Sequence, residues 1–205
     1  GINNHFMNPD WQQWVNTFER PGREVYDQRH AIIAASQVHP GMDVADIGAG
    51  TGLFTRLFAT AVEPGGTVYA IDIASTFVDN ILRTSREQGL SNVTGILNTN
   101  IDTGLPANSI DLAFITDTYH HFEFPQQMLA SIDQALRSEG RVIIIDFRRD
   151  PAISSNWVMG HVRGNKAQVI AEVQAAGFRL VDDKALLRTN YFLEFVKSAQ
   201  KTGKQ

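Results

Sequence analysis

The sequence predicts an α/β fold built on a doubly wound, mostly parallel sheet with helices on both faces. Three observations support this prediction. Short apolar, β-branched runs alternate with segments whose apolar residues recur at helical spacing, six or seven times along the chain. One run leads into a glycine-rich turn at residues 48–52, and a helical segment follows at once. The last two strand-like runs lie too close together for a helical crossover, which predicts a C-terminal antiparallel hairpin.

The first 39 residues are expected to form helices that precede the sheet. Trp11, Trp14 and Phe18 are spaced three and four residues apart, as on one face of a short helix. Pro21-Gly22 ends that helix, and residues 23–38 predict a second one. We therefore divide the chain into N-terminal helices over residues 1–39, expected to form a lid, and one domain over residues 40–205.

The elements of the domain follow from hydrophobic runs and from the glycines and prolines between them. Strands are expected at residues 42–47, 67–71, 93–97, 110–115, 141–146, 178–181 and 191–196, and helices at 53–61, 75–88, 125–137 and 166–176. Pro64-Gly65-Gly66 stops the first of these helices, and Gly89 and Gly177 are suited to end the second and the last. Pro125 suits the first turn of the third helix. The run IDLAFI at residues 110–115 is typical of a strand buried on both faces.

Composition limits the class of protein. The chain has 205 residues, of which 43% are hydrophobic, enough for one domain with a substantial core. The net charge is −4 and no long basic run occurs, so nucleic acid is not expected as a partner. Cysteine is absent, which excludes disulfides and thiolate metal sites. We expect neither membrane insertion nor a secretory signal, because no apolar run is long enough and residues 1–9 are mostly polar.

The glycine turn and an acid beyond it predict a nucleoside-containing cofactor. Glycines at positions 48, 50 and 52 tolerate positive φ and let a ligand approach the backbone closely. The free N–H groups of the following helix point at whatever covers the turn. Asp72 ends the next strand, where a carboxylate is placed to accept hydrogen bonds from ribose hydroxyls. The sequence therefore predicts a cofactor across the carboxyl ends of parallel strands.

The glycine spacing distinguishes between cofactors. Asp46 precedes a G-x-G-x-G turn, whereas the dinucleotide fingerprint is G-x-G-x-x-G. This turn resembles motif I of the class I S-adenosylmethionine-dependent methyltransferases. The tract LPANSID at residues 105–111 is similar to a segment of the ubiquinone-methyltransferase-like branch, and SEGR at 138–141 and AAGF at 175–178 are also similar to family tracts. The resemblance covers residues 40–197. It implies a seven-stranded sheet, S-adenosyl-L-methionine as cofactor and S-adenosyl-L-homocysteine as product. Because this cofactor is a cytosolic metabolite, we expect a cytoplasmic location.

The resemblance also implies roles for individual residues. Around the amino-acid part of the cofactor it places Gly48, Ala49, Gly50 and Gly52, with Asp46 bracing the turn or binding the methionine moiety. Asp72 is expected to hold the ribose hydroxyls. The remaining expected contacts are Ile73 on the adenine face, one of Asn100, Ile101 and Asp102 at the adenine amino group, and Thr116, Asp117 and Thr118 on the methionine side.

The methyl acceptor is expected near the segments that follow the fourth and fifth strands. By fold analogy the fourth strand points at the reactive carbon, and Tyr119, His120 and His121 follow it. We take these three and His161 as candidate catalytic residues, with a histidine as general base. The alternative is that the histidines only pack or are solvated. Tyr119, Phe122, Phe124 and Trp157 are candidates for an aromatic wall or for the core, and Arg148 or Arg163 for pairing with an anionic substrate group.

We expect no metal ion. Adjacent histidines in an extended segment point in opposite directions, so His120, His121 and a carboxylate such as Glu123 are not expected to form a ligand set. The lid residues that share a predicted helix face and are candidates for contact with the cofactor carboxylate are Arg23, Tyr26 and Arg29.

The predicted function is methyl transfer from S-adenosylmethionine to a small-molecule acceptor. The identity of the acceptor, the methylated element (O, N, S or C) and the oligomeric state stay open. One alternative is a non-catalytic protein that binds S-adenosylmethionine or S-adenosylhomocysteine. The other is a NAD(P)-dependent oxidoreductase, which the glycine spacing and the lack of a Tyr-x-x-x-Lys pair disfavour.

Overall fold

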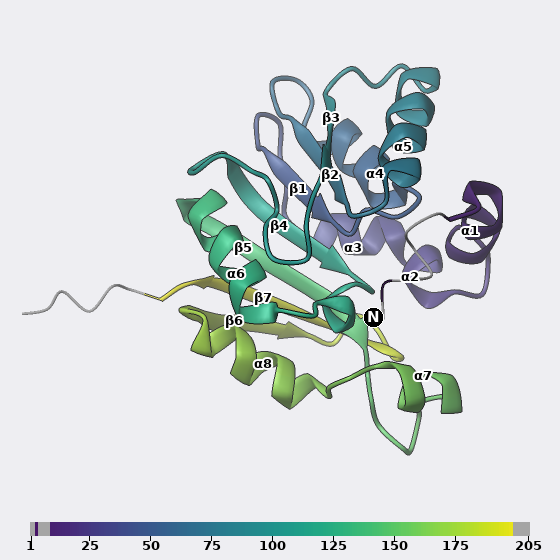
Figure 1. Cartoon of the computed structure of the whole chain (residues 1–205), viewed down its shortest axis with the longest axis vertical. Helices are drawn as coiled ribbons and strands as arrows, with labels where there is room; N and C mark the ends of the chain where they lie inside the picture. The colour runs from purple at the N-terminus through teal and green to yellow at the C-terminus, as the bar shows by residue number, and fades with distance from the viewer. Residues whose placement is uncertain (1–2, 4–8, 199–205) are drawn as a thin grey trace, which may run out of the picture.

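The structure is a computed structural model that describes residue 3 and residues 9–198. Its centre is a seven-stranded sheet with the order β3-β2-β1-β4-β5-β7-β6 (Figure 1). The strands are β1 (Val44–Ile47), β2 (Val68–Asp72), β3 (Val93–Leu97), β4 (Ile110–Thr116), β5 (Leu136–Phe147), β6 (Phe178–Lys184) and β7 (Asn190–Lys197). The predicted fold class, a doubly wound and mostly parallel sheet, is confirmed.

Strand β1 lies where the order of the strands reverses. It pairs in parallel with β2 on one side and β4 on the other, and Ile47 stands opposite both Ile71 and Ile115. All four residues of β1 are buried, as expected for a strand covered on both faces. From β1 the chain continues to β2 and β3, and then crosses to β4 and β5 on the other side. Such a reversal leaves a crevice at the carboxyl ends of the strands, where α/β proteins bind ligands.

The C-terminal strands form the predicted antiparallel hairpin. β7 lies between β5 and β6 and runs antiparallel to both. The first six residues of β7 are buried, in keeping with its interior position. Burial alternates along β6, the strand at the edge of the sheet, which indicates one packed and one solvated face.

Helices cover both faces of the sheet (Figure 1). They are α1 (Trp11–Phe18), α2 (Glu24–Asp27), α3 (Arg29–Ala35), α4 (Leu53–Ala61), α5 (Ser75–Glu87), α6 (Pro125–Ala135), α7 (Asn156–His161) and α8 (Lys166–Ala175). The core under α6 and α8 includes Leu129 and Val173. The core on the other face lies under α3 and α4, where the rings of Phe58 and Phe114 have centroids 4.8 Å apart. Helix α5 packs against β2 and β3.

The structure differs from the prediction at four places. Strand β5 begins at Leu136 instead of residue 141, so residues 136–137, which were predicted to end a helix, belong to the strand. Residues 23–38 form two short helices, because the backbone of Gln28 leaves the helical region with φ −93° and ψ 9°. Helix α7 was not predicted, since six residues are too few to show a periodic pattern, although Ser155 caps it by accepting from the N–H of Val158. A short 3₁₀ helix, η2 (Tyr119–His121), was also not predicted.

Among the described residues, no helix combines the length and the apolar character that crossing a membrane requires.

Candidate active site

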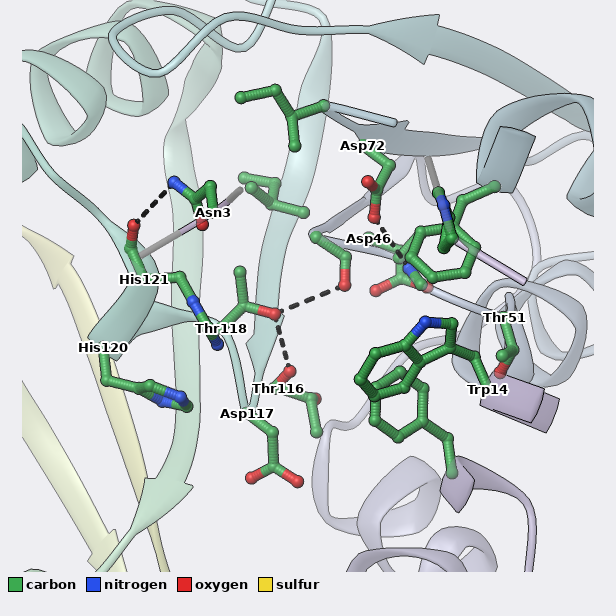
Figure 2. Close-up of a pocket in the computed structure, with 18 of the residues that line it drawn as sticks. Asn3, Trp14, Asp46, Thr51, Asp72, Thr116, Asp117, Thr118, His120 and His121 are labelled. Atoms are coloured by element: carbon green, nitrogen blue, oxygen red, sulfur yellow. Dashed lines mark hydrogen bonds between the residues drawn. The ribbon is translucent and has the colours of Figure 1, made fainter. Parts of the chain in front are cut away.

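The main cavity opens at the carboxyl ends of β1, β2 and β4 and has a volume of about 1050 Å³. Figure 2 shows Asp46 and Asp72 on one side of Thr118, and His120 and His121 on the other. We call the first side the acidic end, defined by Asp46 and Asp72. We call the second the histidine end, defined by His120, His121 and His161, which also lines the cavity.

The glycine turn between β1 and α4 lines the acidic end. Gly48 and Gly50 have φ values of +71° and +55°, which disfavour other residues. A Cβ atom on Gly48 would lie 2.2 Å from Cγ2 of Thr118, so the packing of the chain itself requires glycine there. A Cβ atom on Gly50 would project toward the Phe18 ring, 3.4 Å away, and both residues line the cavity. Gly52 does not line it; this residue precedes α4 and packs against Ile81.

Two buried carboxylates lie at the acidic end. The Thr55 hydroxyl donates to Asp46 at 2.6 Å, and the N–H groups of Gly50 and Ala74 donate to Asp72 at 2.9 and 3.0 Å. Burial raises the pKa of each carboxyl to about 6, and the charge of Asp72 adds to the rise at Asp46. Because a carboxylate accepts about four hydrogen bonds, Asp72 both fixes the turn and keeps capacity for a ligand.

The residues after β3 form another side of the acidic end. Asn98 and Asn100 line the cavity, whereas Ile101 is 43% exposed and does not. The Asp102 carboxylate also lies outside the lining and accepts from Gly104 N–H at 2.8 Å. Oδ1 of Asn98 is buried and has no partner among the described residues. We did not predict Asn98 from the sequence. It directly follows β3 and therefore lies at the same edge of the sheet as Asp72, which ends β2.

Asp117 joins the N-terminal helices to the sheet. It follows β4 with φ +48°, and its two oxygens accept from Arg23 at 2.5 Å and from Asn190 at 2.6 Å. Burial raises the pKa of Asp117, and the charge of Arg23 opposes that rise. Its neighbour Thr116 has a buried hydroxyl without a partner among the described residues. Thr116 and Thr118 both line the cavity, as does Asp117.

Three imidazoles gather at the histidine end. Helix η2 holds His120 and His121 with ring centroids 4.2 Å apart, and α7 brings His161 to 5.1 Å from each. The expectation that the adjacent side chains diverge was wrong, because the segment turns as a 3₁₀ helix instead of extending. Burial, with the neighbouring imidazoles, lowers the pKa of His121 to about 3. Burial and His120 also lower the pKa of His161, which favours the neutral rings.

A buried carboxylate orients His120. Nδ1 of His120 lies 2.8 and 3.0 Å from the two oxygens of Asp146, which also accept from the N–H groups of His120 and Phe147. A carboxylate with these donors acts only as an acceptor, so the imidazole proton belongs on Nδ1. The other nitrogen, Nε2, then carries a lone pair, and it is buried without a partner among the described residues.

Several predicted acceptor-side residues lie outside the cavity lining. Tyr119 is fully buried and its hydroxyl donates to Glu172 at 2.9 Å, which removes the reason for a catalytic role. Arg163 binds the same carboxylate at 2.6 and 2.8 Å, and Arg148 donates to the Asn190 carbonyl at 3.0 Å. Of the aromatic candidates, Phe122 and Trp157 line the cavity, whereas Phe124 is 47% exposed and does not.

The N-terminal helices contribute one wall. Trp14 and Phe18 line the cavity, with ring centroids 4.9 Å apart. Trp11 instead packs edge-on against Phe77 of α5. Of the lid residues expected at the cofactor carboxylate, Arg23 lines the cavity, whereas Tyr26 and Arg29 do not; the Arg29 guanidinium stacks on the Tyr26 ring at 4.3 Å.

Comparison with known proteins gives the family. The sequence model of the family described as "Methyltransferase domain" matches residues 45–144, which contain the glycine turn, Asp72 and the histidine pair. Residues 45–144 are therefore a class I S-adenosylmethionine-dependent methyltransferase domain. Its fold is similar to that of a SAM-dependent methyltransferase from Aquifex aeolicus, with a TM-score of 0.81 and 21% identity over 92% of this chain and 98% of that one. The family and the fold imply S-adenosylmethionine as cofactor and S-adenosylhomocysteine as product.

The relatives that match this chain in sequence include two curated methyltransferases. Nocamycin O-methyltransferase from Saccharothrix syringae is 32% identical over 124 residues, which are 60% of this chain and 44% of that protein. The ubiquinone/menaquinone biosynthesis C-methyltransferase UbiE from Burkholderia vietnamiensis is 32% identical over 122 residues, which are 57% of this chain and 48% of that protein. The chain thus spans about half the length of the curated relatives it matches.

Proposed function

We propose that this methyltransferase transfers a methyl group from S-adenosylmethionine to a small planar acceptor bound at the histidine end. One observation carries the proposal: a single cavity joins the acidic end to the histidine end, with Thr118 between them. The acidic end offers hydrogen-bond acceptors suited to a nucleoside. The histidine end offers the imidazole of His120, whose Nε2 has no hydrogen-bond partner among the described residues, with aromatic rings around it. Methyl transfer needs these two sites side by side, because the nucleophile must approach in line.

The residues of the acidic end fit the cofactor. Asp72 can accept from the ribose hydroxyls, and the unpaired Oδ1 of Asn98 can accept from the adenine amino group, with Ile73 as the apolar contact. Gly50 leaves room beside the turn, and the free hydroxyl of Thr116 can reach the methionine moiety. When bound there, S-adenosylmethionine supplies an activated methyl group. We assign Asn98 to adenine beside Asn100, whose amide donates to Glu123 at 3.4 Å.

The histidine end suits an aromatic or quinone-like acceptor. Phe147 lies edge-on to His120 with ring centroids 5.8 Å apart, and Trp157 stacks on His161 at 4.5 Å. These rings offer flat apolar surface, and Nε2 of His120, oriented by Asp146, is placed to take a proton from an acceptor hydroxyl. The names of the two relatives specify nocamycin O-methylation and C-methylation in ubiquinone/menaquinone biosynthesis, which supports a small-molecule acceptor.

The N-terminal helices act in this proposal as a lid over the acidic end. Trp14 and Phe18 form a wall of the cavity, and the Arg23–Asp117 ion pair fastens this segment to the carboxyl end of β4. A closed wall excludes water from the reacting groups.

Calorimetric titration tests the cofactor assignment. We expect the chain to bind S-adenosylmethionine and S-adenosylhomocysteine, and not NADH. Asp72→Ala should weaken binding of S-adenosylhomocysteine by about 1–3 kcal/mol, because buried ribose hydroxyls lose their acceptor. Asp79→Ala is the matched control, since Asp79 is an exposed carboxylate on α5. Binding of NADH alone would return the turn to the dinucleotide interpretation, and equal affinity of both variants would refute the ribose assignment.

Turnover separates the enzyme from a binding protein. Incubation with S-adenosylmethionine and a panel of quinols, phenols and 1,3-dicarbonyl compounds should release S-adenosylhomocysteine with at least one of them. Tight cofactor binding without release across the panel would favour the non-catalytic alternative.

A further inference from the structure

The histidine end contains a cluster that methyl transfer alone does not require. One ligand nitrogen each from His120, His121 and His161 can be chosen so that all three atoms lie within 4.8 Å of one another. Two separate elements, η2 and α7, supply them. We propose that these three histidines bind a divalent late transition-metal ion such as zinc. The inference deepens the proposed function at the acceptor end, but the ion site itself does not depend on methyl transfer.

The strongest single observation is the unpaired nitrogen of His120. The side chain is 3% exposed, and its Nε2 is buried without a partner among the described residues. Burying such an atom without a hydrogen bond is unfavourable. His120 lines the cavity together with the two other histidines, so a metal ion held by the three would satisfy this nitrogen where a polar partner is missing.

Asp146 gives His120 the partner that metal-binding histidines have. In metal sites the second ring nitrogen of the ligand donates to a carboxylate or a carbonyl, which fixes the tautomer and raises the basicity of the ligand. Nδ1 of His120 has this bond to Asp146 at 2.8 Å, and the backbone N–H of Phe147 holds the same carboxylate at 2.8 Å. The bare nitrogen of His120 is therefore oriented before any ion arrives.

Aromatic rings pack against two of the ligands, His161 and His120. Trp157 stacks on His161 with an interplanar angle of 20°, and Phe147 lies edge-on to both Trp157 and His120. In a tetrahedral zinc site with bonds of about 2.0–2.1 Å, the ligand nitrogens are about 3.3 Å apart. The nitrogens of this cluster lie within 4.8 Å of one another, so side-chain movements of about 1.5 Å would bring them to the distances of a tetrahedral site.

The donor set indicates the class of metal. Neutral imidazoles suit zinc, copper, nickel and iron, whereas magnesium and calcium prefer oxygen ligands. Three protein ligands leave a fourth position open, which is the arrangement of catalytic zinc sites. That position lies at the cavity, where an oxygen or nitrogen atom of the acceptor can coordinate. With a metal bound, the ion rather than Nε2 of His120 would favour the deprotonated acceptor.

Cobalt titration of the chelator-treated, tag-free chain tests the proposal. We expect one equivalent of Co²⁺ to produce a saturable visible absorption typical of tetrahedral coordination, and Zn²⁺ to remove it in competition. His121→Ala and His161→Ala should each weaken binding more than tenfold. The Asp146→Asn variant should weaken it about 10- to 100-fold by loosening His120. His39→Ala is the matched control, because His39 is exposed and does not line the cavity.

For each variant, circular dichroism checks the fold and titration with S-adenosylhomocysteine checks cofactor binding. His161 carries the decisive substitution, because it is only partly buried on a short helix and its removal should leave the fold intact. Absence of saturable cobalt absorption in the wild-type chain would overturn the metal site, and so would unchanged affinity in both His121→Ala and His161→Ala. Cofactor binding is measured separately, so a chain that binds metal but no S-adenosylhomocysteine would refute the proposed function and leave the metal site standing.

Discussion

At the scale of single residues, the glycine turn shows why a motif can have two causes. The family resemblance explains the glycines by close approach of a ligand. In the structure, Gly48 has a second reason, because a Cβ atom there would overlap the Thr118 side chain. Gly50 is the position whose missing side chain leaves space at the cavity. A substitution at Gly48 should therefore act on stability first and on cofactor binding second.

Gly48→Ala is expected to lower the free energy of unfolding by more than the roughly 1 kcal/mol that positive φ alone costs alanine. Gly89→Ala measures that cost by itself, since Gly89 has φ +76° and no atom within 4 Å of the added Cβ. In the double variant Gly48→Ala/Thr118→Gly the overlap disappears, so the excess loss should be recovered. Urea denaturation of the four chains checks this. Equal losses at positions 48 and 89 would show that the overlap with Thr118 relaxes freely.

The sequence predicted those site residues that stand at the end of a strand. Asp46 and Asp72 belong to β1 and β2, and parallel strands bring their carboxyl ends to one edge whatever the loops do. The convergence of His161 on His120 could not be predicted, because it depends on the path of residues 148–155 and on how α7 packs. Tyr119 was a catalytic candidate because it follows the fourth strand, but its hydroxyl donates to Glu172 and the residue does not line the cavity.

At the scale of elements, too, the features that depend on tertiary packing could not be predicted from the sequence. The ends of periodic helices such as α4 and α5 were predicted to within one or two residues, because each helix buries a stripe of apolar side chains against the sheet. The short elements α2, α7 and η2 have too few residues for a period, and tertiary contacts hold them. Helix α2 is the clearest case: it has four residues and one buried side chain, Val25.

Glu24 fixes α2 to the start of β7. Its carboxylate accepts from the N–H groups of Arg188 and Thr189 at 2.7 Å each and from the Thr189 hydroxyl at 2.5 Å. Burial opposes ionisation of Glu24, but these hydrogen bonds outweigh it and lower its pKa. The ionised carboxylate therefore adds stability that is present above the unfolded pKa, near 4.5, and is lost as the pH falls through the lower folded pKa.

Glu24→Gln should reduce the free energy of unfolding by about 1–3 kcal/mol at pH 7, because the amide cannot accept through both terminal atoms. The deficit should shrink as the pH falls below 4.5, where the wild-type carboxylate also becomes neutral. Glu87→Gln is the control, since Glu87 pairs with Arg83 on an exposed helix surface. Thermal unfolding from pH 3 to 7 gives the comparison. A deficit that does not change with pH would mean that the charge of Glu24 contributes nothing.

At the scale of the whole molecule, hydrophobic cores cover both faces of the sheet, whereas its carboxyl edge holds two buried carboxylates that lower stability when they are ionised. Asp46 and Asp72 are 3% and 6% exposed, and burial raises the pKa of each to about 6. Their ordinary pKa in an unfolded chain is about 3.9. Between these values the folded chain holds protons that the unfolded chain has released. The contribution of the pair to stability therefore falls as the pH rises from 4 to 6.

The ionised form of these buried carboxylates is unfavourable in the free chain, whereas a bound ligand favours it at Asp72. Without ligand, the free energy of unfolding of Asp46→Asn should exceed that of the wild type by about 1–3 kcal/mol between pH 4.5 and 7, because the amide avoids a buried charge and still accepts from Thr55.

With saturating S-adenosylhomocysteine, ribose hydroxyls favour the ionised form of Asp72. The rise in melting temperature caused by the ligand should then be larger at pH 7.5 than at pH 5, and Asp72→Asn should abolish this difference. A ligand effect that is equal at both pH values in the wild type would show that the ribose does not bind the Asp72 carboxylate. In that case the raised pKa of Asp72 would belong only to the ligand-free turn.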